Sequence, residues 1–164
     1  MGRYESAEAS YLEAISLSKN GGFMPSFVNL YEIAVIRSRI KVGKEKVDLQ
    51  LLYQQANQNK AKFNDGLMAN YIAEILMNMG QEYVEQAEKW ITRAVDFDLR
   101  NDTRWNLARD YRLQAELFAR KNMNAMAQET YQKAIEVFAT CGAQGWVRRI
   151  EEQLEQLLQK ESPG

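Results

Sequence analysis

The residues that could carry out chemistry in this chain are carboxylates and one thiol, because histidine is absent. Without histidine, neither a Ser-His-Asp triad nor a histidine-ligated metal site can form. Cys141 is the single cysteine, so a thiolate zinc site is excluded as well. Gly43-Lys44 is followed by glutamate instead of Ser or Thr, so it is not a phosphate-binding loop. We expect no catalytic site, no metal and no cofactor. Asp and Glu are so frequent that a carboxylate-pair enzyme stays an open alternative.

The composition is typical of a globular protein, with 46% hydrophobic and 26% charged residues in a chain of 164. Lys and Arg total 21 against 22 Asp and Glu, and this balance predicts no binding to nucleic acid or to anionic membranes. No apolar run approaches the roughly 20 residues of a membrane-spanning helix, and residues 1–6 lack the apolar stretch of a signal peptide. Together with the single cysteine, these features predict a cytoplasmic protein.

A regular spacing of residue types, with a period of about 40 residues, indicates an internal repeat. One period separates Tyr31 from Tyr71 and Tyr71 from Tyr111. The same interval separates four small residues: Ala7, Val47, Ala87 and Ala127. Four positions after each of these stands a large residue, and in three cases a small residue follows three positions later. Spacings of four and three lie on one face of an α-helix. Each unit is therefore expected to be a pair of helices that buries its apolar stripe against the next pair.

These residues resemble the tetratricopeptide repeat. Residues 2–14 match the second half of its pattern, G-x-Y-x2-A-x3-Y-x2-A. The best complete copy consists of Tyr111, Ala115, Phe118, Asn122, Ala127, Tyr131 and Ala134. The copy over 31–56 is the most degenerate, and a two-residue shift to Leu49, Tyr53 and Ala56 fits it equally well. The resemblance implies an all-α, right-handed α-solenoid of antiparallel helix pairs, with about three and a half repeats of ~40 residues and a C-terminal capping helix.

The resemblance also predicts the domain organisation. A single domain is expected over residues 1–160, with a tail at 161–164. Its predicted parts are a half repeat at 2–20, helix pairs at 26–57, 64–98 and 102–141, and a capping helix at 144–160. Asn64 and Asp102 are predicted N-caps, Gly142 is a predicted C-cap, and Asn122 replaces the usual glycine at a turn.

In tetratricopeptide arrays the first helix of each pair lines a concave groove, which implies a protein or peptide partner for this chain. Matching positions to the three tyrosines gives the groove residues: Asn29, Glu32, Ile36, Arg39, Ala69, Ile72, Leu76, Met79, Arg109, Arg112, Glu116 and Arg120. An apolar centre and a basic end would suit a segment with an apolar anchor and a flanking carboxylate. The alternative is that Ile72 and Leu76 pack against a neighbouring helix and that the arginines pair with Asp110 and Glu116.

Gly2 falls at the turn between the two helices of a repeat, so the first helix of that repeat is missing. The remaining helix would then have one neighbour for its apolar residues, which are Tyr4, Ala7, Tyr11, Leu12 and Ile15. This pattern predicts a piece of a longer array and a homodimer formed through the truncated helix. The alternative is that the helix frays.

Residues 131–146 are similar to the last repeat and exit helix of arrays in large bacterial signalling proteins. Those proteins join an ATPase or kinase region to such repeats and often to a sensor or cyclase output. The similarity implies a non-enzymatic scaffold that regulates a larger signalling protein. The alternative is a domain that senses a small ligand, which a deep polar pocket would favour. Trp90, Trp105 and Trp146 are interpreted as packing residues and not as a platform for nucleobases.

Overall fold

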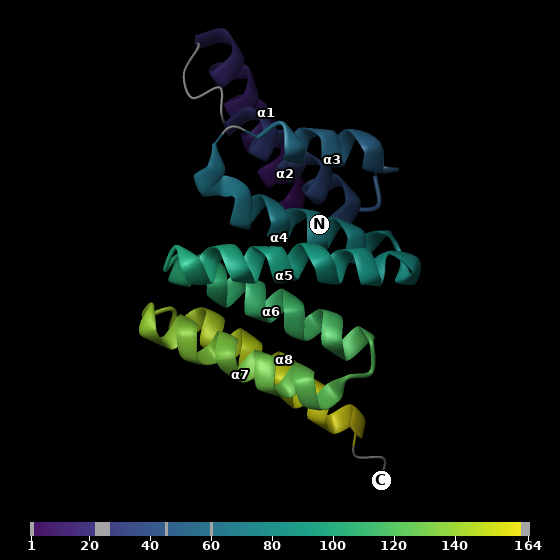
Figure 1. Ribbon diagram of the computed structural model, residues 1–164, viewed down its shortest axis with the longest axis vertical. Helices are drawn as coiled ribbons and strands as arrows, with labels where there is room; N and C mark the ends of the chain where they lie inside the picture. The colour runs from purple at the N-terminus through teal and green to yellow at the C-terminus, as the bar shows by residue number, and fades with distance from the viewer. Residues whose placement is uncertain (1, 22–26, 45, 60, 162–164) are drawn as a thin grey trace. The chain divides into compact units, whose positions relative to one another are not determined.

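The computed structural model describes residues 2–21, 27–44, 46–59 and 61–161. Within these ranges the chain forms eight α-helices and no β-strand, which confirms the predicted all-α class (Figure 1). The helices are α1 (Gly2–Gly21), α2 (Val28–Lys41), α3 (Leu49–Asn57), α4 (Asp65–Met79), α5 (Val84–Arg100), α6 (Arg104–Arg120), α7 (Asn124–Thr140) and α8 (Gln144–Glu161). Short 3-10 segments, η2 (Lys62–Asn64) and η3 (Gln81–Tyr83), lead into α4 and α5.

The packing divides the chain into two compact units, residues 1–90 and residues 91–164. The boundary falls inside α5, whereas the sequence predicted one domain over 1–160.

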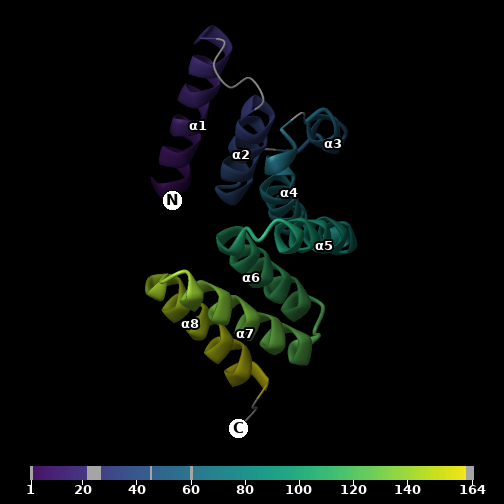
Figure 2. The same cartoon turned by 60° about the vertical axis from the view of Figure 1, so that its left-hand side comes forward.

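In unit 1, α1 lies antiparallel to α2 (Figure 2). Glu8 near the start of α1 pairs with Arg39 near the end of α2, at 2.8 Å, and Lys19 pairs with Glu32 at 2.9 Å. Residues later in α1 thus contact residues earlier in α2, as expected for antiparallel helices. The side of α1 toward α2 consists of buried and half-buried residues spaced three and four apart, as expected for one face of a helix.

Helix α4 is the centre of unit 1. Every residue from Met68 to Met77 is buried, including the polar residues Asn70 and Glu74. The helix packs against α2 and α3. Apart from Asn70 and Glu74, the stretch from Met68 to Met77 is apolar, and a helix that is apolar on nearly all sides is stable only inside a core.

Alternate helices of unit 1 also contact one another and run parallel. The Phe27 ring, before α2, contacts Phe63, before α4, at a centroid distance of 5.3 Å. Further along the same two helices, Arg37 Nε donates to Glu74 Oε2 at 2.5 Å. Each contact joins residues that are slightly less than one predicted repeat apart in the sequence. Helices α2 and α4 therefore lie side by side in the same direction.

Unit 2 holds α6, α7 and α8, with α7 packed between the other two in sequence order. Its core consists of Ala108, Ala115, Tyr131, Ala134, Phe138, Val147 and Ile150. Contacts also link α6 directly to α8. The Trp105 and Trp146 rings lie 6.3 Å apart, and Gln153 Nε2 donates to Glu116 Oε1 at 3.1 Å. The first contact joins the starts of the two helices and the second joins positions further along both, so α6 and α8 are also parallel.

Three evenly spaced turns end helices α5, α6 and α7. Their central residues, Asp102, Asn122 and Gly142, have φ values of 49°, 58° and 70°. The residue after each donates its N–H to the carbonyl five positions earlier, at 3.1, 2.9 and 3.0 Å. This is the Schellman turn, in which a left-handed residue ends the helix. The expected left-handed roles of Asn122 and Gly142 are confirmed.

The structure corrects one predicted N-cap and confirms the position of the other. Asp102 is the left-handed turn residue after α5, and Thr103 holds the N-cap position of α6. Asn64 is the N-cap residue of α4 but makes no side-chain capping hydrogen bond. A side-chain cap is formed by Asp48, whose carboxylate accepts from Gln50 N and Leu51 N at the start of α3.

The second helix of each predicted pair is α3, α5 or α7. In α5 and α7 the residues that the repeat pattern places inside are buried, and in α3 the buried positions are shifted. Helix α5 buries Ala87, Ile91 and Ala94, and α7 buries the residues one repeat later. Helix α3 begins only at Leu49, so Val47 lies in the preceding loop, and the helix buries Leu52 and Ala56 instead. Of the two registers that the sequence left open for this copy, the shifted one agrees better with the structure, because Ala56 is buried and Leu49 and Tyr53 are half-buried, whereas Leu51 and Gln54 are exposed.

Candidate interaction surface

The predicted groove residues fall into separate groups on unit 1 and unit 2. Those on α2 and α4 belong to unit 1, and those on α6 belong to unit 2.

The apolar centre of the predicted groove is core. Ala69, Ile72 and Leu76 have 0% exposure, so they contact other parts of this chain and cannot touch a partner in this conformation. This corrects the groove assignment and agrees with the alternative that Ile72 and Leu76 pack against neighbouring helices. The physical reason is that α4 is buried around its whole circumference. Met79, at the end of α4, keeps part of its surface exposed and lines a cavity.

The polar groove residues of α2 form hydrogen bonds and ion pairs with the neighbouring helices α1 and α3. Asn29 donates to the carbonyl of Gln55 in α3 at 3.2 Å. Glu32 accepts from Gln55 Nε2 at 2.8 Å and also pairs with Lys19 of α1. Arg39 pairs with Glu8 of α1. These side chains therefore fasten α2 to α1 and α3, and Ile36 between them is half-buried.

The groove residues of α6 form a polar group that α7 and α8 complete. Arg112 pairs with Glu116 one turn later, as the alternative interpretation anticipated. Gln153 of α8 donates to the same oxygen, Glu116 Oε1, at 3.1 Å. Burial, with the negative charge of Glu116 adding to it, raises the pKa of Tyr131 to about 12, although Arg112 opposes the shift. Arg109 is half-buried and Arg120 is exposed.

Aromatic rings lie at the N-terminal ends of α6 and α8. Trp105 and Trp146 each contact Phe138, at centroid distances of 5.3 and 5.4 Å. The Arg149 guanidinium lies 4.9 Å above the Trp146 ring, a cation–π contact. Trp105 keeps 44% of its surface exposed, so it is only partly the packing residue that the sequence predicted.

We use the name arginine–tryptophan surface for the residues that these contacts join on α6 and α8, together with Arg109, which lies one helical turn after Trp105. They are Trp105, Arg109, Arg112, Glu116, Trp146, Arg149 and Gln153. Sequence analysis identified Arg109, Arg112 and Glu116 as surface residues but interpreted Trp105 and Trp146 as packing residues and did not single out Arg149 or Gln153. Two signals could have revealed others, since Arg149 follows Arg109 by one repeat interval, and Trp105 precedes Arg109 by one helical turn. The surface carries three arginines against one carboxylate.

The predicted half-repeat interface is mostly turned toward α2. Tyr4, Ala7 and Ile15 are half-buried, and the Tyr11 ring stacks on Tyr31 of α2 at 6.2 Å. Only Leu12, with 45% exposure, is open to solvent as predicted. This corrects the assignment of the whole stripe as an exposed face, because the spacing of these residues matches the side that α2 covers.

A buried carboxylate that the sequence analysis missed lies between α2 and α4. Glu74, whose side chain is 5% exposed, pairs with Arg37 at 2.5 Å and with Lys41 at 2.9 Å. Burial alone would raise its pKa, but the charges of Arg37 and Lys41 and their hydrogen bonds outweigh burial and lower the pKa to about 2. A carboxylate this weakly basic is a poor general base, so the group supports a structural role.

Comparison with known proteins gives no relative. No protein-family model, no curated protein and no solved structure matches the chain. None of the helices in the described part of the chain combines the length and hydrophobicity needed to cross a bilayer. The tetratricopeptide likeness therefore depends on residue spacing alone.

Proposed function

We propose that this chain is a helical-repeat module of the tetratricopeptide type whose role is to bind a segment of another protein. Two features support an α-solenoid with a period of about 40 residues. Alternate helices run parallel in each unit, and the contacts between them join residues close to one period apart. The Schellman turns at Asp102, Asn122 and Gly142 recur at half that period, which is one helix and its turn.

The arginine–tryptophan surface is the observation that carries this function. An exposed tryptophan beside arginines is the composition of a binding hot spot. Trp105 would contact an apolar or aromatic anchor of the ligand. The excess positive charge of Arg109, Arg112 and Arg149 favours carboxylates, which the guanidinium group binds through paired hydrogen bonds. The proposed ligand is thus an acidic peptide segment or helix with an aromatic or aliphatic anchor.

The wider setting proposed for this module follows from the sequence resemblance. In a cytoplasmic bacterial signalling protein, such a module would connect a regulatory partner to an output region. It would have no catalytic role of its own. Self-association through α1 is part of the same proposal, with Leu12 and Leu17 as the exposed apolar residues of that helix.

The test is selection of ligands from a random peptide display library. We expect enrichment of peptides that combine Asp or Glu with an aromatic or aliphatic residue. Trp105→Ala and Arg109→Glu should each weaken binding of the selected peptides about tenfold or more. Arg148→Glu, which changes an exposed residue next to Arg149 but outside the surface, is the matched control and should bind as the parent does.

Two outcomes would refute the proposal. One is the absence of an acidic consensus among the selected peptides. The other is equal binding by the Arg109→Glu and Arg148→Glu proteins. Circular dichroism of each variant separates loss of binding from loss of folding.

A second candidate function, sensing of a small ligand, has one observation in its favour. Unit 1 contains a cavity of about 410 Å³ with polar side chains at its edge.

A further inference from the structure

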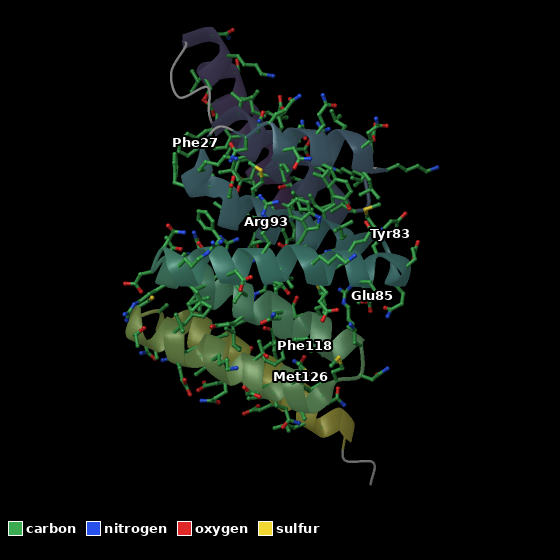
Figure 3. All side chains as sticks on the ribbon, in the orientation of Figure 1. Phe27, Tyr83, Glu85, Arg93, Phe118 and Met126 are labelled. Atoms are coloured by element: carbon green, nitrogen blue, oxygen red, sulfur yellow. The ribbon has the colours of Figure 1, made fainter. Side chains whose placement is uncertain are left out.

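The cavity of unit 1 lies where α2 and α4 both end. Its volume of about 410 Å³ is within the range of small-molecule sites. The lining residues are Ile40, Gly43, Lys46, Val47, Asn78, Met79, Glu82 and Tyr83. Tyr83 lies at the turn that leads into α5 (Figure 3). The cavity is independent of the arginine–tryptophan surface, which belongs to unit 2.

Two oppositely charged side chains, Lys46 and Glu82, line this cavity and do not take part in holding the fold together. Neither Lys46 nor Glu82 forms an ion pair or hydrogen bond with any other described residue. This contrasts with the neighbouring lysines, since Lys41 pairs with Glu74 and Lys44 pairs with Glu5. An ammonium and a carboxylate are therefore both available at one cavity.

Hydrogen-bond acceptors gather on the side of the cavity formed by α4. Asn78 Nδ2 donates to the Glu74 carbonyl at 2.6 Å, and this fixes Oδ1 as the atom that the amide can still offer. The other acceptor is the Glu82 carboxylate. It folds so closely over Gly80 that a Cβ on this glycine would lie 2.9 Å from Glu82 Cδ.

The end of α4 adds further acceptors. At the end of α2, two carbonyls accept hydrogen bonds from the following turn: Gly43 N donates to the Ile40 carbonyl, and Lys44 N donates to the Arg39 carbonyl. In the turn after α4, among the residues that the structure describes, the one backbone bond runs from Tyr83 N to the Gly80 carbonyl. Among the described residues, the carbonyls of Asn78 and Met79 at the end of α4 accept no backbone hydrogen bond from this turn, and the negative end of the helix dipole favours a cation there.

We infer that this cavity binds a zwitterionic α-amino acid with an apolar side chain. The ligand ammonium lies at the α4 end of the cavity, between Glu82 and Asn78 Oδ1. Its carboxylate pairs with Lys46. Its side chain packs on the apolar lining, which consists of Ile40, Val47 and Met79.

The arrangement distinguishes this ligand from simpler ones. A primary amine satisfies the acceptors of α4 and Glu82 but leaves Lys46 without a partner. A carboxylic acid pairs with Lys46 but places no donor at the acceptors. Only a molecule that carries both charges uses both sides, and each charge-assisted hydrogen bond adds to affinity.

The test is a titration of the full chain, labelled at its Ile, Val and Met methyl groups, followed by NMR. The probes are L-leucine, its decarboxylated analogue 3-methylbutylamine and its deaminated analogue 4-methylpentanoate. We expect saturable shifts of the Ile40, Val47 and Met79 methyl groups with leucine, and affinities about tenfold lower for both analogues.

Paired variants separate the two charges. Lys46→Met should reduce affinity for leucine about tenfold while leaving the amine unaffected, and Glu82→Gln should reduce affinity for leucine and the amine. Lys44→Met and Glu85→Gln change nearby residues that do not line the cavity and serve as controls. Both cavity residues are exposed, so their substitution is compatible with folding.

The inference is overturned if leucine shifts none of the three methyl groups up to its solubility limit. It is equally overturned if the amine binds as tightly as leucine and Lys46→Met has no effect. Neither outcome bears on peptide binding at the arginine–tryptophan surface, so the two proposals fail separately.

Discussion

The carboxylate of Glu74 should make unit 1 sensitive to acid in a narrow range. Its pKa is about 2 in the folded chain, against an ordinary value of 4.5. Because the folded pKa is the lower one, the ionised carboxylate stabilises the fold at every pH above 4.5. That contribution is lost as the pH falls from 4.5 toward 2. A difference of this size corresponds to about 3 kcal/mol in the free energy of unfolding.

Glu74→Gln makes the same change at neutral pH. It removes the negative charge and leaves Arg37 and Lys41, which are only 18% and 21% exposed, without their partner. Breaking a buried ion pair in this way typically costs about 3 kcal/mol or more. The wild-type and variant proteins should therefore differ most in stability above pH 4.5 and converge as the pH approaches 2.

The assay is urea unfolding at a series of pH values, followed by fluorescence of Trp90. This tryptophan stacks on Tyr53 at 5.7 Å inside unit 1, and replacing Trp105 and Trp146 with phenylalanine makes it the one fluorophore of its kind. Glu5→Gln is the control, because Glu5 also pairs with a lysine but is exposed to solvent, which screens the pair. If the stability difference between wild type and Glu74→Gln does not change with pH, the buried ion pair does not act as described.

Three further predictions concern backbone and burial. Gly142→Ala should lower stability by about 1 kcal/mol, because φ is 70° there, whereas Asn122→Gly should be neutral or stabilising; chemical unfolding compares them. Gly80→Ala should cost about 1–3 kcal/mol in the same assay, because φ is 154° there, while the exposed carboxylate of Glu82 can move away from the added Cβ. The pKa of Tyr131 is about 12 in the folded chain against an ordinary value of 10, so this residue costs the fold stability as the pH rises from 10 to 12. Tyr131→Phe should therefore lose less stability over this range, which chemical unfolding at high pH measures.

The positions of the helices were predictable because the signals that place them are local. The spacing of small and aromatic residues identified the helices, and Asn122 and Gly142 showed where two of them end. The register of α3 was not predictable in the same way. This helix has 9 residues, too few for the spacing to choose between alternatives, and Asp48 fixes its start through a capping bond.

The candidate site was harder to predict because burial depends on every neighbour of a helix. Ile72 and Leu76 occupy positions that match the groove pattern, but α4 is buried on all sides and removes them from the surface. The pairing of Arg37 with Glu74 joins residues 37 positions apart and leaves no pattern in the sequence. By contrast, Arg149 could have been found from Arg109, because the repeat interval alone relates them.

The charged groove residues of α2 and α6 differ in what they contact, and this difference favours unit 2 over unit 1 for the proposed peptide binding. On α2, the charged groove residues Glu32 and Arg39 pair with α1, so they would have to be released before a ligand could use them. On α6, Arg112 is held by Glu116 of the same helix, a contact that a ligand can replace without separating two helices. Breaking a bond within one helix perturbs the fold less than breaking one between helices. A ligand carboxylate therefore has an easier approach at α6 than at α2.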